Sequence, residues 1–228
     1  LDRTIDAWFL QAAAIGARSP MMPSYGNHEA LLGEAVEPWA ARFPTPPGFD
    51  GQRNYSFDVG DVHLVSIFAV ENSKALTPET FAWLRDDLMA ARAAGARWLL
   101  PFFHVSPFAA GDTPPSNNKL RAQLGPLFER LGVKVSLSSH DQAYERTYPL
   151  IDVPATNTPT ASTVAHGCYG LDDGVTWVKT SPGGKLSNLN HGFSDFRSDP
   201  APFADGCQAR GVLILHRPTG CCRIARHD

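Results

Sequence analysis

The stretch that decides the fold runs from Trp98 to His104 and reads WLLPFFH. Its first six residues form an unbroken apolar run, the pattern of a strand that is buried on both faces of a sheet. The run ends at a histidine, and a loop rich in Pro, Gly, Ser and Asn follows over residues 105–118. The stretch therefore predicts a central strand whose carboxyl end presents a side chain that can bind a metal ion.

Hydrophobic periodicity on both sides of this strand predicts alternating strands and helices. Apolar residues at helical spacing predict helices at residues 1–18, 77–94 and 120–131. Thr77 precedes Pro78 and is the expected N-cap of the second of these helices. Short apolar runs predict further strands at residues 21–25, 55–59, 62–69, 133–137, 175–179 and 212–216. The alternation predicts an α/β layered fold, and a hairpin signal at Gly60-Asp61 predicts mixed sheets.

The composition suits a single packed domain. Of the 228 residues, 43% are hydrophobic and 19% are charged, which is enough apolar material for one core. The net charge is -3 and no basic stripe runs along the chain, so we expect no nucleic-acid partner. No apolar run is long enough to span a bilayer. The sequence opens at Leu1 directly in an expected helix, so we expect further residues upstream, together with any targeting segment.

The cysteines indicate in which cellular compartment the protein is found. All four lie in the last third of the chain, at Cys168, Cys207, Cys221 and Cys222, and none shows the Cys-x-x-Cys spacing of a zinc site. An even number in a loop-rich region predicts one or two disulfides, and hence a secreted or periplasmic protein. Unpaired buried thiols are the alternative, and the spacing leaves the pairing open.

Three predicted strands end in polar side chains. The strand at residues 21–25 is followed by GNHE at 26–29. The second strand ends at His104, and the third is followed by HDQ at 140–142. Because ligands bind where strand ends converge in layered α/β folds, we expect these endings to form a single site. Taken alone, each histidine could be an ordinary buried histidine that is hydrogen-bonded in a core.

These endings resemble the signature blocks of a known family. The sequence GNHE at residues 26–29 resembles the third block of the calcineurin-like metallophosphoesterases. Residues 101–108, PFFHVSPF, resemble the block that supplies a metal-binding histidine, and residues 139–147, SHDQAYERT, resemble the last block. The Tyr-Glu-Arg of that block is similar to the purple-acid-phosphatase-like branch, as are the stretches at residues 55–60 and 181–185. The ordered set of blocks spans most of the chain.

The resemblance implies a four-layer α/β/β/α sandwich. The chain would be a single metallophosphoesterase domain over residues 1–228, with C-terminal strands and cysteine-containing loops at residues 188–228. The first two blocks of the family, Asp-x-His and Gly-Asp-x-x-Asp, normally precede Gly-Asn-His-Glu, and neither occurs in the 25 residues before Gly26. The domain would therefore be incomplete at its N-terminus. A missing N-terminal segment or a partner chain would be needed to complete the metal site.

The resemblance also implies metal ligands. The family holds two metal ions, drawn from Fe, Zn and Mn. By position, Asn27, His104 and His140 would bind the second ion, and imidazole and amide groups suit these metals. Gln142 stands where the family has a histidine bound to the first ion, and it offers an amide oxygen instead. It could bind metal or only line the pocket.

The reaction implied is hydrolysis of a small phosphate monoester by a hydroxide that the metal ions activate. His28 would lie beside the phosphate as a general acid or a transition-state stabiliser, and Glu29 would hold or tune that histidine. Tyr144 and Arg146 would shape the substrate pocket, although Arg146 could equally be a structural ion-pair partner.

Two other functions stay open. A catalytically inactive module derived from this family, which binds a partner or builds structure, is favoured by the missing blocks and by changes in the last block. There, Ser139 replaces a glycine, and a serine adopts positive φ only at a cost. A phosphodiesterase or nucleotidase is the alternative within the enzyme class. Asp61-Val62-His63 also spells Asp-x-His, but it follows GNHE and begins in an expected turn, so we expect no metal there.

Overall fold

The computed structural model describes residues 2–31, 37–71, 74–109, 114–140, 143–155, 159–163, 169–170, 172–181 and 203–208. Its centre is a mixed seven-stranded sheet in the order β1-β2-β3-β4-β8-β5-β9, beside a two-stranded sheet of β6 and β7. The strands are β1 Tyr55–Val59, β2 Val62–Ile67, β3 Trp98–Phe103, β4 Val135–Ser138, β5 Ala143–Thr147, β6 Leu150–Ile151, β7 Thr160–Ala161, β8 Thr176–Thr180 and β9 Phe203–Gln208. The helices are α1 Asp2–Gly16, α2 Asn27–Leu31, α3 Glu37–Ala40, α4 Pro78–Ala93 and α5 Asn118–Arg130.

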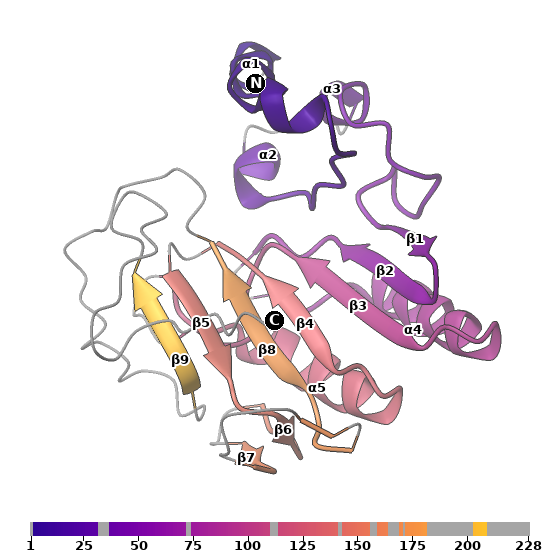
Figure 1. Ribbon diagram of the computed structural model, residues 1–228, viewed down its shortest axis with the longest axis vertical. Coiled ribbons are helices and arrows are strands. Elements are labelled where there is room, and N and C mark those ends of the chain that lie inside the picture. The colour runs from indigo at the N-terminus through magenta and orange to yellow at the C-terminus, as the bar shows by residue number, and fades with distance from the viewer. Residues whose placement is uncertain are drawn as a thin grey trace.

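The path of the chain places α4 and α5 on the same face of the sheet (Figure 1). Strands β2, β3 and β4 are parallel neighbours, with α4 connecting the first pair and α5 the second. Because such crossovers are right-handed, successive connections in one direction put their helices on one side. Helices α1, α2 and α3 lie beyond the carboxyl ends of the central strands. The prediction of a mixed α/β fold is confirmed, and the described residues supply one sheet and one helical layer of the expected sandwich.

Local signals explain where the elements begin and end. In the β1–β2 hairpin, Gly60 has a φ of +61° and Val59 pairs with Val62, as the Gly-Asp signal predicted. Helix α4 begins after Thr77, whose side-chain oxygen accepts from the backbone N–H of Thr80 at 3.2 Å. Helix α5 is capped in the same way by Asn117, which falls in the loop predicted at residues 105–118.

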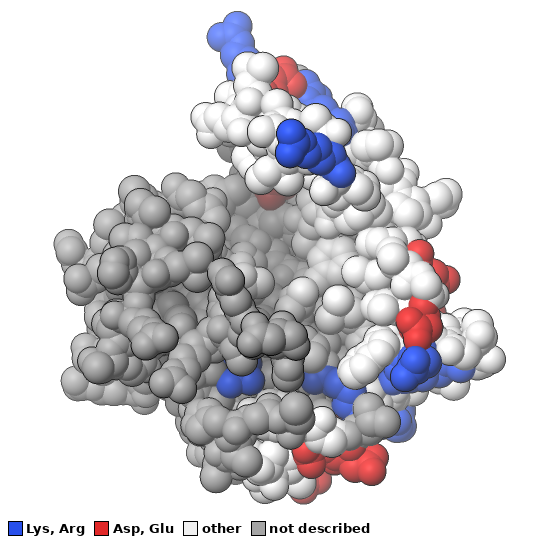
Figure 2. All heavy atoms as spheres, viewed as in Figure 1, with Lys and Arg blue, Asp and Glu red and all other residues white. Residues whose placement is uncertain are grey.

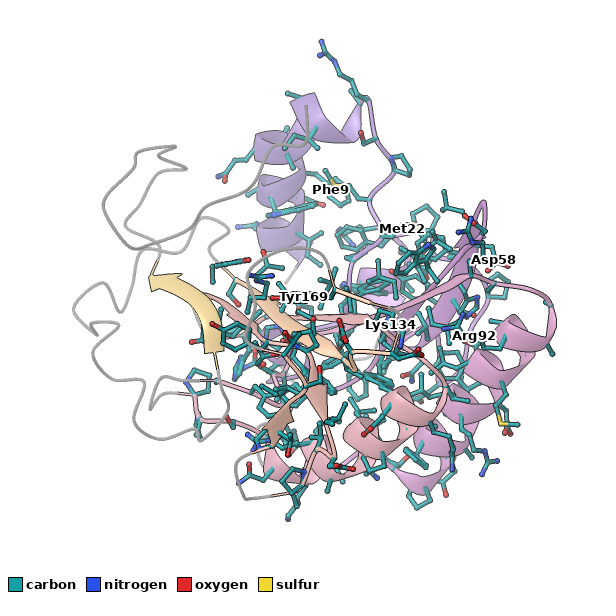
Figure 3. All side chains as sticks on the ribbon, turned by 60° about the horizontal axis from the view of Figure 1, so that its bottom comes forward. Phe9, Met22, Asp58, Arg92, Lys134 and Tyr169 are labelled. Atoms are coloured by element: carbon teal, nitrogen blue, oxygen red, sulfur yellow. The ribbon has the colours of Figure 1, made fainter. Side chains whose placement is uncertain are left out.

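The main core lies between the sheet and helices α4 and α5. Leu84, Leu88 and Leu124 are fully buried there, and burying each such side chain contributes roughly 1.5–3 kcal/mol. The ring of Phe128 stacks on Trp177 of β8, with 5.5 Å between ring centroids. At the far ends of the helices, one guanidinium joins the two: Arg92 of α4 donates to backbone carbonyls that follow α5 (Figure 3). Helices α4 and α5 are thus packed on the sheet and hydrogen-bonded to each other's ends.

A second, aromatic cluster holds the N-terminal helices over the end of the sheet. Its buried members are Ile5, Tyr25, Trp39, Phe43, Tyr55 and Val70. The ring of Tyr25 lies 5.3 Å from Trp39 and 5.4 Å from Phe68, and the hydroxyl of Tyr55 donates to the carbonyl of Pro23 at 2.7 Å. These contacts position the segment that leads into Gly26.

Several predicted boundaries are wrong. Residues 21–25 were expected to form a strand, and the structure has them outside any strand. Pro23 lacks the N–H that a ladder needs, and Tyr25 instead packs into the aromatic cluster, so the apolar run reflects burial rather than strand pairing. The strands expected at 133–137 and 175–179 are shifted to Val135–Ser138 and Thr176–Thr180, and the first helix ends at Gly16.

The C-terminal region is described only in part. Strand β9 falls within residues 188–228, whereas the strand expected at 212–216 lies outside the described residues. Cys168, Cys221 and Cys222 also lie outside the described residues, and Cys207 of β9 is described for its backbone alone, so the disulfides stay a prediction. Among the helices described, none is both long and apolar enough to span a membrane. On the face in Figure 2, the Lys and Arg side chains of the described residues are scattered and form no continuous basic surface.

Candidate functional site

Three of the expected ligands lie together at the carboxyl ends of the central strands. Asn27 is the first residue of α2, His104 directly follows β3, and His140 follows β4, which is the parallel neighbour of β3. The side-chain oxygen of Asn27 lies 2.7 Å from Nε2 of His104. The rings of His104 and His140 are in edge contact, with 4.7 Å between centroids and an interplanar angle of 61°. The fold therefore brings together an amide and two imidazoles that are distant in the sequence.

Gly26 allows this close approach. A Cβ at this position would lie 2.8 Å from Oε2 of Glu29 and 3.2 Å from Nδ1 of His104, so no larger residue fits without displacing a neighbour. The backbone N–H of Gly26 donates to the same Glu29 oxygen at 3.0 Å. Glu29 therefore holds the turn that presents Asn27, and its suggested effect on His28 stays a prediction.

Burial keeps His104 neutral. Removal from water lowers the pKa of its imidazole to about 4, and His140 and His28 add smaller contributions in the same direction. His104 is therefore uncharged at neutral pH, the form in which imidazole binds metal ions. His28 itself is exposed, at the second position of α2 and directly after Asn27.

The backbone of the last block is left-handed at His140, which has a φ of 77°. Ser139, which stands where the family has a glycine, is not among the described residues with positive φ. This conformation is costly for a residue with a Cβ, and such residues concentrate at functional sites. The N–H of Ser139 donates to the carbonyl of His104 at 2.9 Å, which joins the two histidine loops.

Sequence reasoning missed a set of buried groups beneath these loops. The hydroxyl of Ser138 donates to that of Ser106 at 2.9 Å, and Ser106 in turn donates to the carbonyl of Phe108. Arg121 of α5 is fully buried, donates through Nε and Nη2 to the carbonyl of Pro107 at 3.1 Å, and lies over the ring of Phe108 at 4.1 Å. These groups contact loop carbonyls or one another, and the contacts depend on how the loops lie in space. No local sequence motif therefore reveals them.

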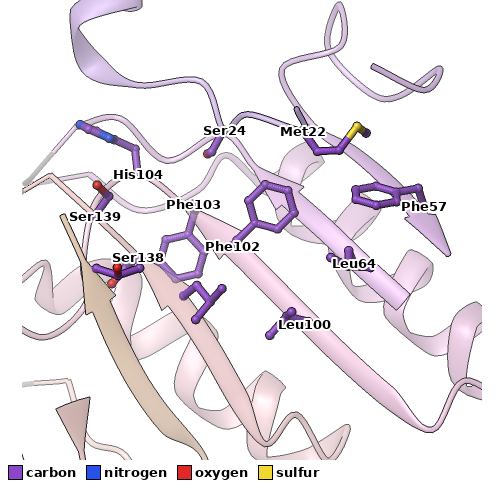
Figure 4. Close-up of a pocket in the computed structure, with 12 residues that line it drawn as sticks. Met22, Ser24, Phe57, Leu64, Leu100, Phe102, Phe103, His104, Ser138 and Ser139 are labelled. Carbon is purple, nitrogen blue, oxygen red and sulfur yellow. The ribbon is translucent and has the colours of Figure 1, made fainter. Parts of the chain in front are cut away.

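A cavity of about 410 Å³ adjoins His104 (Figure 4). Aromatic and aliphatic side chains of the sheet form most of its wall, and the hydroxyls of Ser24, Ser138 and Ser139 add polar groups near the histidine. The volume falls in the range of sites that hold small molecules.

The other predicted site residues are less tied to this cluster. Tyr144 and Arg146 are half-buried on β5, and the guanidinium of Arg146 lies 5.9 Å from the ring centroid of Tyr169. Gln142 lies outside the described residues. His63, from the Asp-x-His sequence, is buried away from the cluster, and its two ring nitrogens contact Asp58 at 2.8 Å and Asp87 at 2.9 Å. These contacts join His63 of β2 to β1 and α4.

The donors present fit one metal ion better than two. Asn27, His104 and His140 offer one amide oxygen and two imidazoles, a neutral set that suits Zn, Fe or Mn. Within the described part of the chain, no group of three or more His, Cys, Asp or Glu side chains is placed to hold an ion. The carboxylates that would bridge to a second ion are thus not found among the described residues.

Two acid phosphatases are similar to this chain in sequence. No protein-family model matches the chain. It is 26% identical over 189 residues to human acid phosphatase type 7, covering 71% of this chain and 42% of that protein. It is 25% identical over 198 residues to purple acid phosphatase 23 of Arabidopsis thaliana, covering 83% of this chain and 40% of that protein. The chain is a relative of the purple acid phosphatases.

The resemblance drawn from the three blocks is therefore confirmed. A purple acid phosphatase from yellow lupin seeds has a similar fold, with a TM-score of 0.50 and 18% identity over 68% of this chain and 27% of that one. The chain spans about 40% of the length of the two purple acid phosphatase relatives compared above. Conclusions about the reaction of the whole protein are accordingly proposals.

Proposed function

We propose that this chain belongs to a metal-dependent phosphoesterase that hydrolyses small phosphate monoesters. The observation that carries the proposal is the convergence of Asn27, His104 and His140, with Asn27 Oδ1 2.7 Å from Nε2 of His104. It occurs in a relative of the purple acid phosphatases, beside a cavity of about 410 Å³ that can take a small ester.

Each side chain then has a task. Asn27, His104 and His140 would hold a Zn, Fe or Mn ion, which when bound supplies Lewis-acid polarisation of a phosphate oxygen. His28, exposed at the start of α2, would donate a proton to the leaving alkoxide oxygen or a hydrogen bond to a phosphate oxygen. Glu29 would keep the α2 turn in place, and Tyr144 and Arg146 would contact the substrate. Gln142 would be a further weak ligand or a pocket residue.

A dinuclear site would need ligands for a second metal ion. The Asp-x-His and Gly-Asp-x-x-Asp blocks do not precede Gly26 in this sequence, so a second ion would take ligands from outside it. A preceding segment or a partner chain would supply them. A secreted or periplasmic location, with disulfides among the four cysteines, completes the proposal.

The test compares 4-nitrophenyl phosphate with bis(4-nitrophenyl) phosphate as substrates of the purified protein, with Zn²⁺, Mn²⁺ or Fe²⁺ added. We expect the monoester to react faster, and His28→Ala to lower kcat by about 10²-fold or more without releasing metal. A faster diester reaction would favour the phosphodiesterase alternative. Metal binding with no hydrolysis of either ester would favour the inactive module.

A further inference from the structure

A buried ion pair joins β5 to β8 close to the candidate site. Nζ of Lys179 lies 2.7 Å from Oε1 of Glu145, and the two side chains are 1% and 3% exposed. The two residues are direct partners across the antiparallel ladder. Charges this deeply buried are tolerated only when they are paired, because each alone would carry a large desolvation cost.

The path of the chain makes His140 depend on the register of these two strands. In the sheet, β8 lies between β4 and β5, so the chain leaves β4, passes His140 and returns as β5 on the other side of β8. Only residues 139–142 connect β4 to β5. A slip of β5 by one residue would move this connection by about 3.4 Å and turn the β5 side chains to opposite faces.

The sequence pattern of β5 selects its register only weakly. Residues 143–147 read AYERT, which lacks the alternation of apolar and polar residues that normally selects one register. Its pairing with β9 is irregular, with a register shift between Arg146 and Thr147. A slip of two residues would keep the faces but set Glu145 opposite Trp177 or Ser181, separating two buried charges. The N–H of Trp177 also donates to Oγ1 of Thr147 at 3.1 Å, so this contact depends on the register as well. The ion pair is the contact whose loss would separate two buried opposite charges.

We propose that Lys179 and Glu145 are positioning residues: their ion pair selects the register of β5 on β8 and thereby holds His140 against His104. The proposal depends on the proposed function only for the expected effect on metal affinity. Polar pairs that specify register are the best-attested use of buried ion pairs.

The test uses two double variants and one control. Glu145→Leu with Lys179→Met removes both charges and keeps apolar bulk, which preserves stability in other buried pairs. Glu145→Lys with Lys179→Glu exchanges the charges and keeps the pair. Leu88→Ala, in the core of α4, destabilises the fold at a residue that lies outside both strands.

The first readout needs no metal: the NMR contact between the ring protons of His104 and His140, together with cross-strand amide contacts between β5 and β8. We expect both to persist in the charge-exchanged variant and in Leu88→Ala. In the apolar variant we expect a weakened ring contact and more than one set of β5 signals. Co²⁺ titration with its visible absorption is the second readout, with affinity about tenfold lower in the apolar variant alone.

An apolar variant that keeps one β5 register and the parental ring contact would overturn the proposal. If that variant does not fold, the charge-exchanged variant decides: loss of the ring contact in a folded charge-exchanged protein would also overturn it. A parent protein that binds no Co²⁺ would refute the metal site of the proposed function. The ring contact and the β5 register would then still test the ion pair separately.

Discussion

The side-chain oxygen of Asn27 and Nε2 of His104 lie 2.7 Å apart, although 77 residues separate them in the sequence. One belongs to the turn that starts α2, and the other to the residue that follows β3. The aromatic cluster that holds α1, α2 and α3 over the sheet end makes this meeting possible. Substitutions of residues around this contact should therefore change stability or metal affinity.

Gly26→Ala should disturb the candidate site. The new Cβ would lie 2.8 Å from Oε2 of Glu29 and 3.2 Å from Nδ1 of His104, so one of them must move. We expect a loss of about 1–3 kcal/mol in the free energy of unfolding. We also expect a drop of about tenfold in Co²⁺ affinity. Urea unfolding and absorption titration measure the two.

Gly16→Ala is the matched control, because its Cβ would make only an ordinary contact of 3.4 Å with Met21. It should leave Co²⁺ affinity unchanged. Equal affinities in the parent and Gly26→Ala would show that the close approach at Gly26 has no bearing on the site.

His63 should make stability depend on pH. The hydrogen bond to Asp87, opposed by burial and helped by Asp58, raises the pKa of His63 in the folded protein above its usual value of 6.5. The charged form is therefore favoured by folding. Its stabilisation is fully present below the unfolded pKa of about 6.5 and is lost as the pH rises through the higher folded pKa.

Comparing the parent with His63→Gln by urea unfolding, from about pH 5.5 to about pH 9, tests this effect. The stability advantage of the parent should be largest at the acid end and should shrink as the pH rises. Asp58→Asn should have a smaller effect than Asp87→Asn, because the Asp58 side chain is 70% exposed and that of Asp87 is 19% exposed. An advantage that grows with pH would contradict the assignment.

Arg121 should stabilise the loop after His104. Arg121→Met removes the donors to the Pro107 carbonyl and the cation over the Phe108 ring, which we expect to cost about 2–4 kcal/mol of unfolding free energy. Arg121→Lys keeps the charge but not the planar fork, so it should recover only part of this loss. Urea unfolding measures both variants, and a Lys variant as stable as the parent would contradict a role for the fork geometry.

The fold could be predicted where the physical signal was local. The apolar run before His104 predicted strand β3 with the observed bounds. The expected burial on both faces is wrong, because Leu99, Pro101 and Phe103 are buried on one face, whereas Leu100 and Phe102 on the other are only partly buried. The Thr77 cap was equally local. Strand β5 was missed because its polar residues are buried through an ion pair with β8, a partner that no local pattern reveals.

The sequence predicted which candidate side chains lie together, but it did not predict the groups that hold their loops in place. Motifs at strand ends predicted that Asn27, His104 and His140 share one site, and the structure places them in contact. Arg121 and Ser138 act through backbone carbonyls and another hydroxyl, so their roles depend on where the loops lie. The presence of Ser139 in place of a glycine did not reveal that the left-handed residue is His140.

Titration of the protein with Zn²⁺ or Co²⁺ by calorimetry tests the central claim most directly, with His104→Ala, His140→Ala and Asn27→Leu beside the parent. His63→Gln serves as the control for a buried histidine outside the site. We predict that the parent and His63→Gln bind with the same affinity, and that each of the other three variants binds about tenfold more weakly or less. A parent that binds no ion, or a His104→Ala variant that binds as well as the parent, would contradict the account.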